Sequence, residues 1–294
     1  MLALVLAATL ALAPPVVPPP EEPSAPPQTV HRVKSPTRKP QAPAASAPQQ
    51  RLAEAEARAA KLVTDNARLQ QETAMAQGLA PTDVTTPEAA LAELKAGNAR
   101  FVAGKRIRTL LSMQDGELRN ALAKGQAPFA VILTCSDSRL ADNILFDQEM
   151  GRLFTVREAG NSPDIQSLAS VEYALEHLGT RLVVVLGHTH CGAVQAVYEA
   201  HGKPLPGNLW SLQAAMAGLL ETTQEDPNET SADYVQRLVV ANAQRQARSV
   251  LDRSEIIRHL ADSGKVKVVP AVYDLASGRV HYLEALKAPP PAGH

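Results

Sequence analysis

The sequence has little cysteine, no excess of one charge and no long apolar run. Its 294 residues include only 2 cysteines, too few for the disulfide framework of a small secreted scaffold. Lysine and arginine number 29 against 30 acidic residues, so the chain lacks the basic surface that nucleic acids and anionic membranes require. No stretch approaches the roughly 20 apolar residues that span a bilayer. These absences exclude a disulfide scaffold, a nucleic-acid-binding protein and a multi-spanning membrane protein.

Proline divides the chain into two unlike parts, because 12 of its 23 prolines fall within residues 1–48. Residues 1–13 are an apolar run of signal-peptide length that ends in a small-residue Ala-Leu-Ala pattern. No basic residue precedes the run and Pro14 follows it, two features that signal peptides disfavour. We expect export to the periplasm or beyond. The alternatives are a cytoplasmic protein and a dispensable apolar tail.

Two further segments precede the predicted folded part. Residues 14–48 are rich in Pro, Ala, Ser and Gln and lack apolar periodicity, so they cannot bury enough surface to offset the entropy of ordering. We predict a disordered tether there. Residues 49–77 contain neither Pro nor Gly and are rich in Ala, Glu, Arg and Gln, a composition that favours helix. A weak heptad with Asn66 at a core position allows two interpretations, a short self-associating coiled coil and a single solvated helix.

Residues 86–288 alternate between strand and helix patterns. Short apolar runs at 129–134, 153–156 and 181–186 are typical of strands buried on both faces, and two more segments, 266–273 and 279–283, complete the predicted sheet. Helical patterns cover residues 87–101, 167–178 and 239–260. This alternation predicts an α/β domain, in which helices flank a mainly parallel sheet. Binding residues of such a sheet gather at the carboxyl ends of its strands.

Both cysteines follow predicted strands. Cys135 comes directly after the first strand, and His188 and Cys191 follow the third. Cys, His and Cys form the three-ligand set of an open, catalytic zinc site, and thiolates favour zinc over magnesium or calcium. Asp137 and Arg139 follow Cys135 closely, at a spacing that allows the guanidinium to pair with the carboxylate. The alternatives are cysteines buried as small apolar residues beside a hydrogen-bonded core histidine, and a disulfide between the two cysteines.

Five motifs make the chain resemble the β-class carbonic anhydrases, especially their bacterial members. They stand in the family's order over about residues 86–287: Leu94-Lys-Ala-Gly97-Asn98-Ala-Arg100-Phe101, Cys135-Ser-Asp137-Ser-Arg139, Phe146-Asp-Gln148 through Val156-Arg157-Glu-Ala-Gly160-Asn161, Gly187-His188-x-x-Cys191-Gly-Ala-Val194, and Ala271-Val-Tyr273-Asp-Leu-x-x-Gly278. The resemblance implies that family's fold, a zinc cofactor, carbon dioxide and bicarbonate as substrate and product, and a homodimer or dimer of dimers.

The resemblance also implies roles for individual residues. Cys135, His188 and Cys191 match the family's three zinc ligands, and Asp137 and Arg139 match its Asp/Arg dyad. In active relatives a water occupies the fourth zinc position while the arginine holds the aspartate, and in an alternative state the aspartate itself occupies that position. The implied reaction is attack on CO2 by hydroxide that zinc generates from water. Hydrolysis of COS or CS2 on the same scaffold, and a non-catalytic zinc-bearing assembly domain, are the alternative functions.

Three further residues stand out near these motifs. Gln148 matches a glutamine of many bacterial members and is a candidate hydrogen-bond donor to substrate. Glu158 stands where relatives usually carry a neutral residue, so we expect it to alter the pH profile more than the activity. His190 lies beside the ligands in sequence, which invites a role in proton transfer, but a solvent-facing or packed ring is the expected arrangement.

Overall fold

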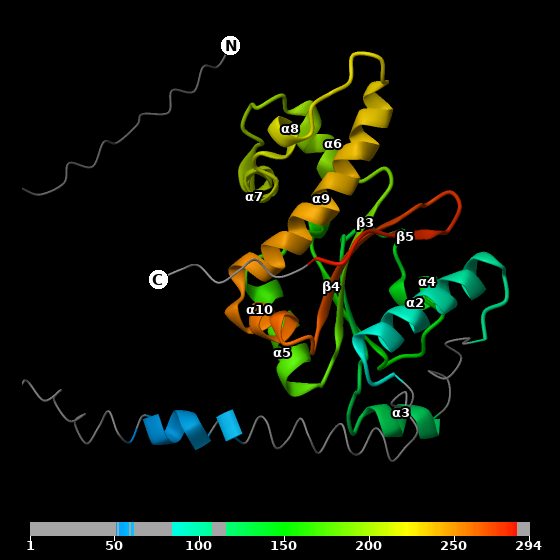
Figure 1. The fold of residues 1–294 in the computed structure, drawn as a ribbon, viewed down its shortest axis with the longest axis vertical. Coiled ribbons are helices and arrows are strands. Elements are labelled where there is room, and N and C mark those ends of the chain that lie inside the picture. Colours follow the sequence, from blue (N-terminus) through cyan, green and yellow to red (C-terminus); the bar gives the residue numbers. More distant parts are fainter. Residues whose placement is uncertain (1–50, 52, 59, 62–83, 108–115, 287–294) are drawn as a thin grey trace, which may run out of the picture. The chain divides into compact units, whose positions relative to one another are not determined.

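The structure, a computed structural model, describes residues 51, 53–58, 60–61, 84–107 and 116–286 (Figure 1). The chain divides into two units, Met1–Ala47 and Pro48–His294, and every described residue belongs to the second. Within the predicted 49–77 helix, the described residues are helical. The signal-like segment, the tether and most of the heptad lie outside the described residues, so export, disorder and coiled-coil formation stay predictions.

A five-stranded sheet lies at the centre of the fold, in the order β2-β1-β3-β4-β5. Its strands are β1 (Ala130–Thr134), β2 (Leu153–Arg157), β3 (Leu182–His188), β4 (Lys267–Tyr273) and β5 (Val280–Tyr282). The first four are parallel, and β5 is antiparallel to β4. β1 and β3 are buried along their whole length, as their continuous apolar runs predict. The predicted α/β fold with a mainly parallel sheet is confirmed.

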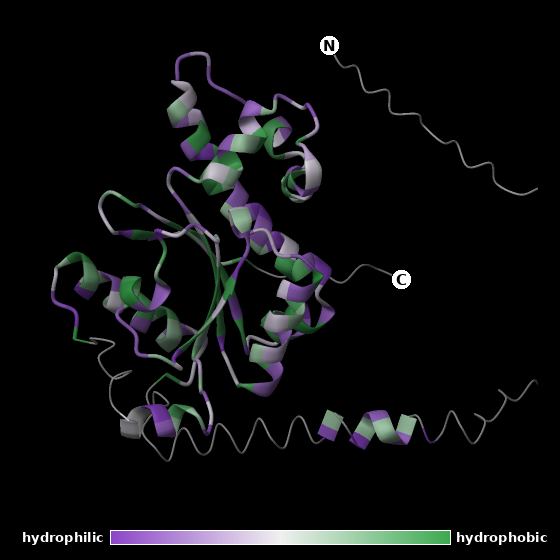
Figure 2. Ribbon diagram, turned by 180° about the vertical axis from the view of Figure 1, so that it is seen from behind, coloured by the Kyte–Doolittle hydropathy of each residue, from purple (hydrophilic) through white to green (hydrophobic). Residues whose placement is uncertain are grey.

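Helices cover both faces of the sheet (Figure 1). Successive side chains of a strand point to opposite faces, so Ile132 and Val184 join one core cluster while Val131 and Val183 join the other. Four helices contribute to the first cluster only: α2 (Pro87–Val102), α4 (Asp142–Leu145), α6 (Gly192–Glu199) and α8 (Leu219–Thr222). Two contribute to the second only: α5 (Ile165–His177) and α10 (Glu255–Asp262). Figure 2 shows the strands between these layers as mainly hydrophobic.

The long helix α9 (Ser231–Arg253) contributes to both clusters, through Leu238 in the first and Val250 in the second. The sequence predicts one helix over residues 239–260, which is wrong because the structure divides this stretch at Ser254. Ser254 has extended backbone angles, and its hydroxyl accepts the Ile257 N–H at 3.1 Å, so it caps α10.

The remaining elements are short: α3 (Gly116–Leu122), η2 (Ala159–Asn161), η3 (Gly207–Leu209) and α7 (Trp210–Ala215). The turn η2 follows β2 and lies against β1, β3 and α6, so it belongs to the carboxyl edge of the sheet. Among the helices of the described part, none combines the length and apolar character that crossing a bilayer requires.

Candidate metal centre

Three buried side chains meet at the carboxyl edge of the sheet. Cys135 follows β1, His188 is the last residue of β3, and Cys191 is the N-cap of α6. Because β1 and β3 are adjacent and parallel, with Thr134 paired to Leu186, their carboxyl ends lie side by side. The two Sγ atoms and a ring nitrogen of His188 all lie within 4.8 Å of one another. Both cysteines are free, so the structure brings the three residues together as a candidate metal site rather than as a disulfide.

The His188 ring is oriented as a metal ligand requires. A carbonyl oxygen only accepts, so the 2.9 Å contact with Thr189 O places the ring proton on Nδ1 and leaves a lone pair on Nε2. Nε2 is buried and has no hydrogen-bond partner among the described residues. A buried polar atom without a partner costs free energy unless something binds it. With two soft sulfur donors beside this nitrogen, the donor set fits a zinc ion.

The two thiols differ in acidity. The hydrogen bond from the Cys191 thiol, with a further contribution from the backbone N–H of Gly160, lowers the pKa of Cys135 to about 4. The same contact with Cys135 raises the pKa of Cys191 above its ordinary value. Cys135 is therefore the first of the pair to become a thiolate, the form that binds metal.

Asp137 and Arg139 form a bidentate pair beside this cluster. Arg139 Nε and its backbone N–H donate to Asp137 Oδ1 at 2.8 and 3.0 Å, and Nη2 donates to Oδ2 at 2.7 Å. These hydrogen bonds hold the pKa of the Asp137 carboxyl well below its usual range. Asp137 Oδ2 lies 3.8 Å from His188 Nε2, so the ionised carboxylate lies at the rim of the candidate site. Arg139 Nη2 also donates to His190 O at 3.1 Å and so joins the two ligand-bearing segments.

Two groups without a role in the predicted site, Arg157 and the Gly160 N–H, hold the segment after β1. Arg157 donates to three carbonyl oxygens of this segment, those of Cys135 at 3.2 Å, Asp137 at 2.6 Å and Leu140 at 3.0 Å. The Gly160 N–H donates to Cys135 Sγ at 3.3 Å. A hydrogen bond to a ligand sulfur is the kind of outer contact that orients a metal ligand and tunes its basicity.

A signal for these contacts is present in the strand pairing. Arg157 is the last residue of β2 and pairs with Thr134, the last residue of β1. Its long side chain therefore leaves the sheet where the ligand segment begins. Gly160 has a positive φ of 67°, a conformation that favours glycine. Both residues lie in a motif of the family resemblance, but their partners depend on the strand register, which local sequence patterns do not determine.

Gln148 is fully buried and its amide has three partners. Nε2 donates to Glu93 Oε1 at 2.8 Å and to Phe146 O at 2.9 Å, and Oε1 accepts from Arg152 Nε at 2.9 Å. These contacts tie the segment after α4 to α2 and do not include the cysteine and histidine cluster. A role for Gln148 toward substrate stays a prediction.

Glu158 and His190 lie close to the site in sequence but differ in their contacts. Glu158 Oε1 accepts from Ser167 Oγ at 3.1 Å, which ties it to α5. His190 is exposed and has a positive φ of 55°, and its backbone oxygen accepts from Arg139. The structure thus places His190 at the surface, where its backbone oxygen makes the contact with Arg139.

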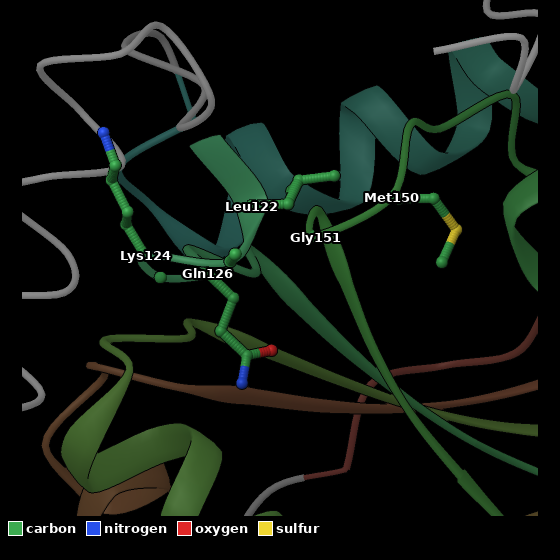
Figure 3. A pocket seen from close by; sticks show the side chains of 7 residues that line it. Leu122, Lys124, Gln126, Met150 and Gly151 are labelled. Atoms are coloured by element: carbon green, nitrogen blue, oxygen red, sulfur yellow. The ribbon is translucent and has the colours of Figure 1, made fainter. Parts of the chain in front are cut away.

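A cavity of about 410 Å³ lies at the opposite end of β1 (Figure 3). Its lining comes from residues 122–126, just before β1, and residues 150–151, just before β2. Lys124, Gln126 and Met150 are the larger side chains around it. The cavity therefore lies at the amino ends of the strands, and it contains none of the predicted site residues.

Three comparisons relate the chain to known proteins. The carbonic anhydrase family matches residues 130–280. Carbonic anhydrase 2 of Mycobacterium tuberculosis is 38% identical over 197 residues, which cover 66% of this chain and 92% of the relative. The structure of the β-carbonic anhydrase CafA of Aspergillus fumigatus is 28% identical, with a TM-score of 0.52 and coverage of 69% of this chain and 92% of that one. A tetrameric β-carbonic anhydrase of Sordaria macrospora has a TM-score of 0.54 at 24% identity, covering 68% and 99%.

Proposed function

The chain belongs to the β-carbonic anhydrase family, and on that premise we propose that it catalyses the zinc-dependent, reversible hydration of carbon dioxide to bicarbonate and a proton. One observation carries the proposal. The unpartnered Nε2 of His188 and the sulfurs of Cys135 and Cys191 converge within 4.8 Å, beside a carboxylate that Arg139 holds ionised. A merely structural zinc site would not need that ionised pair.

Cys135, His188 and Cys191 would hold the zinc ion. When bound, zinc supplies a Lewis acid that lowers the pKa of water from about 15.7 to near 7. The protein's share of this chemistry is to hold the donors in place. The hydrogen bond from Nδ1 to Thr189 O fixes the His188 ring, and the Gly160 N–H orients the Cys135 sulfur.

Asp137 orients the attacking water. An ionised carboxylate only accepts hydrogen bonds, so Asp137 would bind a water through one of its hydrogens. That hydrogen bond would turn the lone pair of the water oxygen toward the carbon of CO2. Arg139 contributes by engaging both carboxylate oxygens, which keeps the acid ionised and fixes its direction. Neither rim group suits the transfer of the released proton, because the low pKa of Asp137 makes it a weak base and the Arg139 guanidinium is already protonated, so the proton leaves through water.

The test is stopped-flow CO2 hydration by the full chain, with bound zinc quantified in the same sample. We expect close to one zinc per chain and hydration well above the buffer rate. One zinc per chain without hydration would overturn the proposal. Parallel assays with COS and CS2 distinguish the sulfur hydrolase, which would act on those gases in preference to CO2. A chain that binds zinc and is inactive on all three would fit the non-catalytic assembly domain.

We further propose that the protein is exported and that it assembles as a homodimer or dimer of dimers. The apolar run at residues 1–13 supports export. The tetrameric relative from Sordaria macrospora supports an oligomer. A reporter that is active only outside the cytoplasm, fused to residues 1–48, should give signal that deletion of residues 2–13 abolishes. Light scattering on the chain with and without residues 51–77 should give the same oligomer if the heptad does not carry assembly.

A further inference from the structure

A chain of buried amides connects the core of α9 to the sulfur of Cys135. Asn242 and Gln246 are fully buried polar residues in the apolar stripe of α9, one helical turn apart. Burying an amide costs free energy unless it is hydrogen-bonded. Each of these amides has partners, and the contacts run toward the candidate metal centre.

The contacts form a sequence of three links. Gln246 Nε2 donates to Asn242 Oδ1 at 3.0 Å, and Asn242 Nδ2 donates to Gly160 O at 2.8 Å. The Gly160 N–H then donates to Cys135 Sγ at 3.3 Å. Gly160 thus holds Asn242 through its carbonyl and the candidate ligand through its amide.

The orientation of the amides is fixed by their partners. Gln246 Nε2 donates to Ala215 O at 3.1 Å as well as to Asn242 Oδ1, which uses both of its hydrogens. Turning the Asn242 amide over would set its oxygen against Gly160 O and its nitrogen against Gln246 Nε2. Both contacts would be repulsive, so only one arrangement satisfies every group.

Gly160 needs such support because its backbone is unusual. It has φ 67° and ψ 22°, in the left-handed region, and a side chain there would place Cβ 2.2 Å from Met216 Cε. Its carbonyl accepts from Asn242 and also from Ser162 Oγ at 3.1 Å. The Ser162 bond lies within the turn itself, whereas the Asn242 bond anchors the turn to the core.

We propose that Asn242, supported by Gln246, is a positioning residue for the zinc ligand Cys135, holding the Gly160 turn so that its amide donates to the ligand sulfur. This inference rests on the zinc site of the proposed function. Donation to a ligating thiolate draws electron density from the sulfur and fixes its direction. Loss of the Asn242 bond releases the turn and weakens that donation, although Asn242 itself touches neither metal nor substrate.

The test compares Asn242→Ala with Thr180→Val in the full chain. Thr180 is also fully buried, and its hydroxyl donates to Pro128 O at 3.0 Å at the amino end of β3, so the control loses one buried hydrogen bond far from the metal. Outer-shell substitutions lower metal affinity by about 10-fold or more, so zinc release to a chromophoric chelator should be about 10-fold faster in Asn242→Ala and unchanged in Thr180→Val. In the cobalt-substituted proteins, the thiolate-to-metal charge-transfer band should move to lower energy only in Asn242→Ala.

Gln246→Met gives a second variant, conservative in volume, that keeps Asn242 but removes its donor. It should change zinc release in the same direction by a smaller factor, and it decides the question if Asn242→Ala does not fold. The inference would be overturned if the variants released zinc at the wild-type rate, showed an unmoved cobalt band and lost only as much thermal stability as Thr180→Val. The proposed function would be unaffected by that outcome. A wild-type chain that takes up neither zinc nor cobalt would overturn the proposed function, and this inference with it.

Discussion

The two segments that carry the candidate ligands are built in different ways. Residues 135–142, after β1, are held by side chains, because Arg157 donates to three of their carbonyl oxygens and Arg139 engages Asp137. Residues 188–191 run from the last residue of β3 to the N-cap of α6, and besides accepting from Arg139 they are held by the backbone of the flanking elements. Thr189 N–H donates to Tyr273 O at 2.9 Å, which extends the pairing of β3 with β4, and Cys191 O accepts the Gln195 N–H in the first turn of α6.

This difference in support predicts which substitutions each segment can tolerate. Side-chain bonds depend on the identity and charge of the donor, so the 135–142 segment should respond to substitutions that leave its backbone unchanged. Backbone bonds survive such substitutions, so the 188–191 segment should respond mainly where a side chain restricts φ and ψ. We therefore expect the 135–142 segment to set how the site is tuned and the 188–191 segment to provide a rigid base.

The largest effect should come from removing a ligand, and it should be equal in both segments. Cys135→Ser, His188→Ala and Cys191→Ser each leave two donors of three, so we expect zinc content to fall to a small fraction of wild type and CO2 hydration to be lost. Metal analysis and stopped-flow assays on the same samples measure both. Full zinc and activity in any one variant would show that its residue is not a ligand.

Asp137→Ala should separate chemistry from metal retention within the 135–142 segment. The three donors remain, so zinc content should stay near wild type. The hydrogen-bond acceptor for the attacking water is gone, and hydration should fall by about 100-fold, the scale for losing one oriented polar group in a catalytic site. Loss of zinc in this variant would instead make Asp137 a metal ligand.

The sequence predicted the parts of this site that follow from strand order. Cys135 and His188 were expected together because parallel strands end at one edge of the sheet. The partners of Arg157 and the burial of Gln148 were not expected. They depend on strand register and on the approach of α2 to the segment after α4, where a Cβ on Gly97 would lie 1.8 Å from Phe146 O. Such contacts join residues 17 to 55 positions apart, beyond the reach of a local pattern.

The division of the predicted 239–260 helix shows a second limit. Ser254 and Glu255 form a recognisable helix start, because Ser254 caps α10 and an acidic residue opens its first turn. Apolar periodicity continues across this cap, which hid the break. Ser254 also makes a long-range contact, since its Oγ donates to Glu172 Oε1 on α5 at 2.5 Å.

A third prediction concerns the far end of the 135–142 segment. Burial raises the pKa of Asp142 to about 6, although the charge of Arg157 opposes this. The folded pKa lies above the unfolded one, so this group's contribution to stability is full below about pH 4 and is lost as the pH rises through about 6. Two pKa units correspond to about 3 kcal/mol.

Urea unfolding of wild type and Asp142→Asn at pH 5 and pH 8 tests this. The wild type should lose more stability than the variant between these values, and the variant should be the more stable protein at pH 8. Every other ionisable group is the same in both proteins, so the difference between them isolates Asp142. Parallel pH dependences would show that the buried carboxyl ionises freely.

Arg157→Gln and Thr189→Val form a matched pair across the two segments. The first removes a charged donor with three acceptors and should cost only about 2 kcal/mol, because Arg157 is exposed, while speeding zinc release. The second removes the hydroxyl that accepts the Leu275 N–H at 3.0 Å and should cost about 1 kcal/mol without changing zinc release. Equal rates of zinc release in the two variants would contradict the proposed difference between side-chain and backbone support.

The smallest effect should come from His190→Gly in the backbone-held segment. His190 has φ 55°, a conformation that costs a residue with a side chain about 1 kcal/mol, and glycine removes this cost while adding a similar entropy cost to folding. We expect the free energy of unfolding to change by less than about 0.5 kcal/mol, and hydration to be unchanged because the backbone oxygen still accepts from Arg139. His190→Val, which keeps the same oxygen but resists a positive φ, should be clearly less stable. A fall in hydration in His190→Gly that added imidazole restores would instead assign the ring to proton transfer.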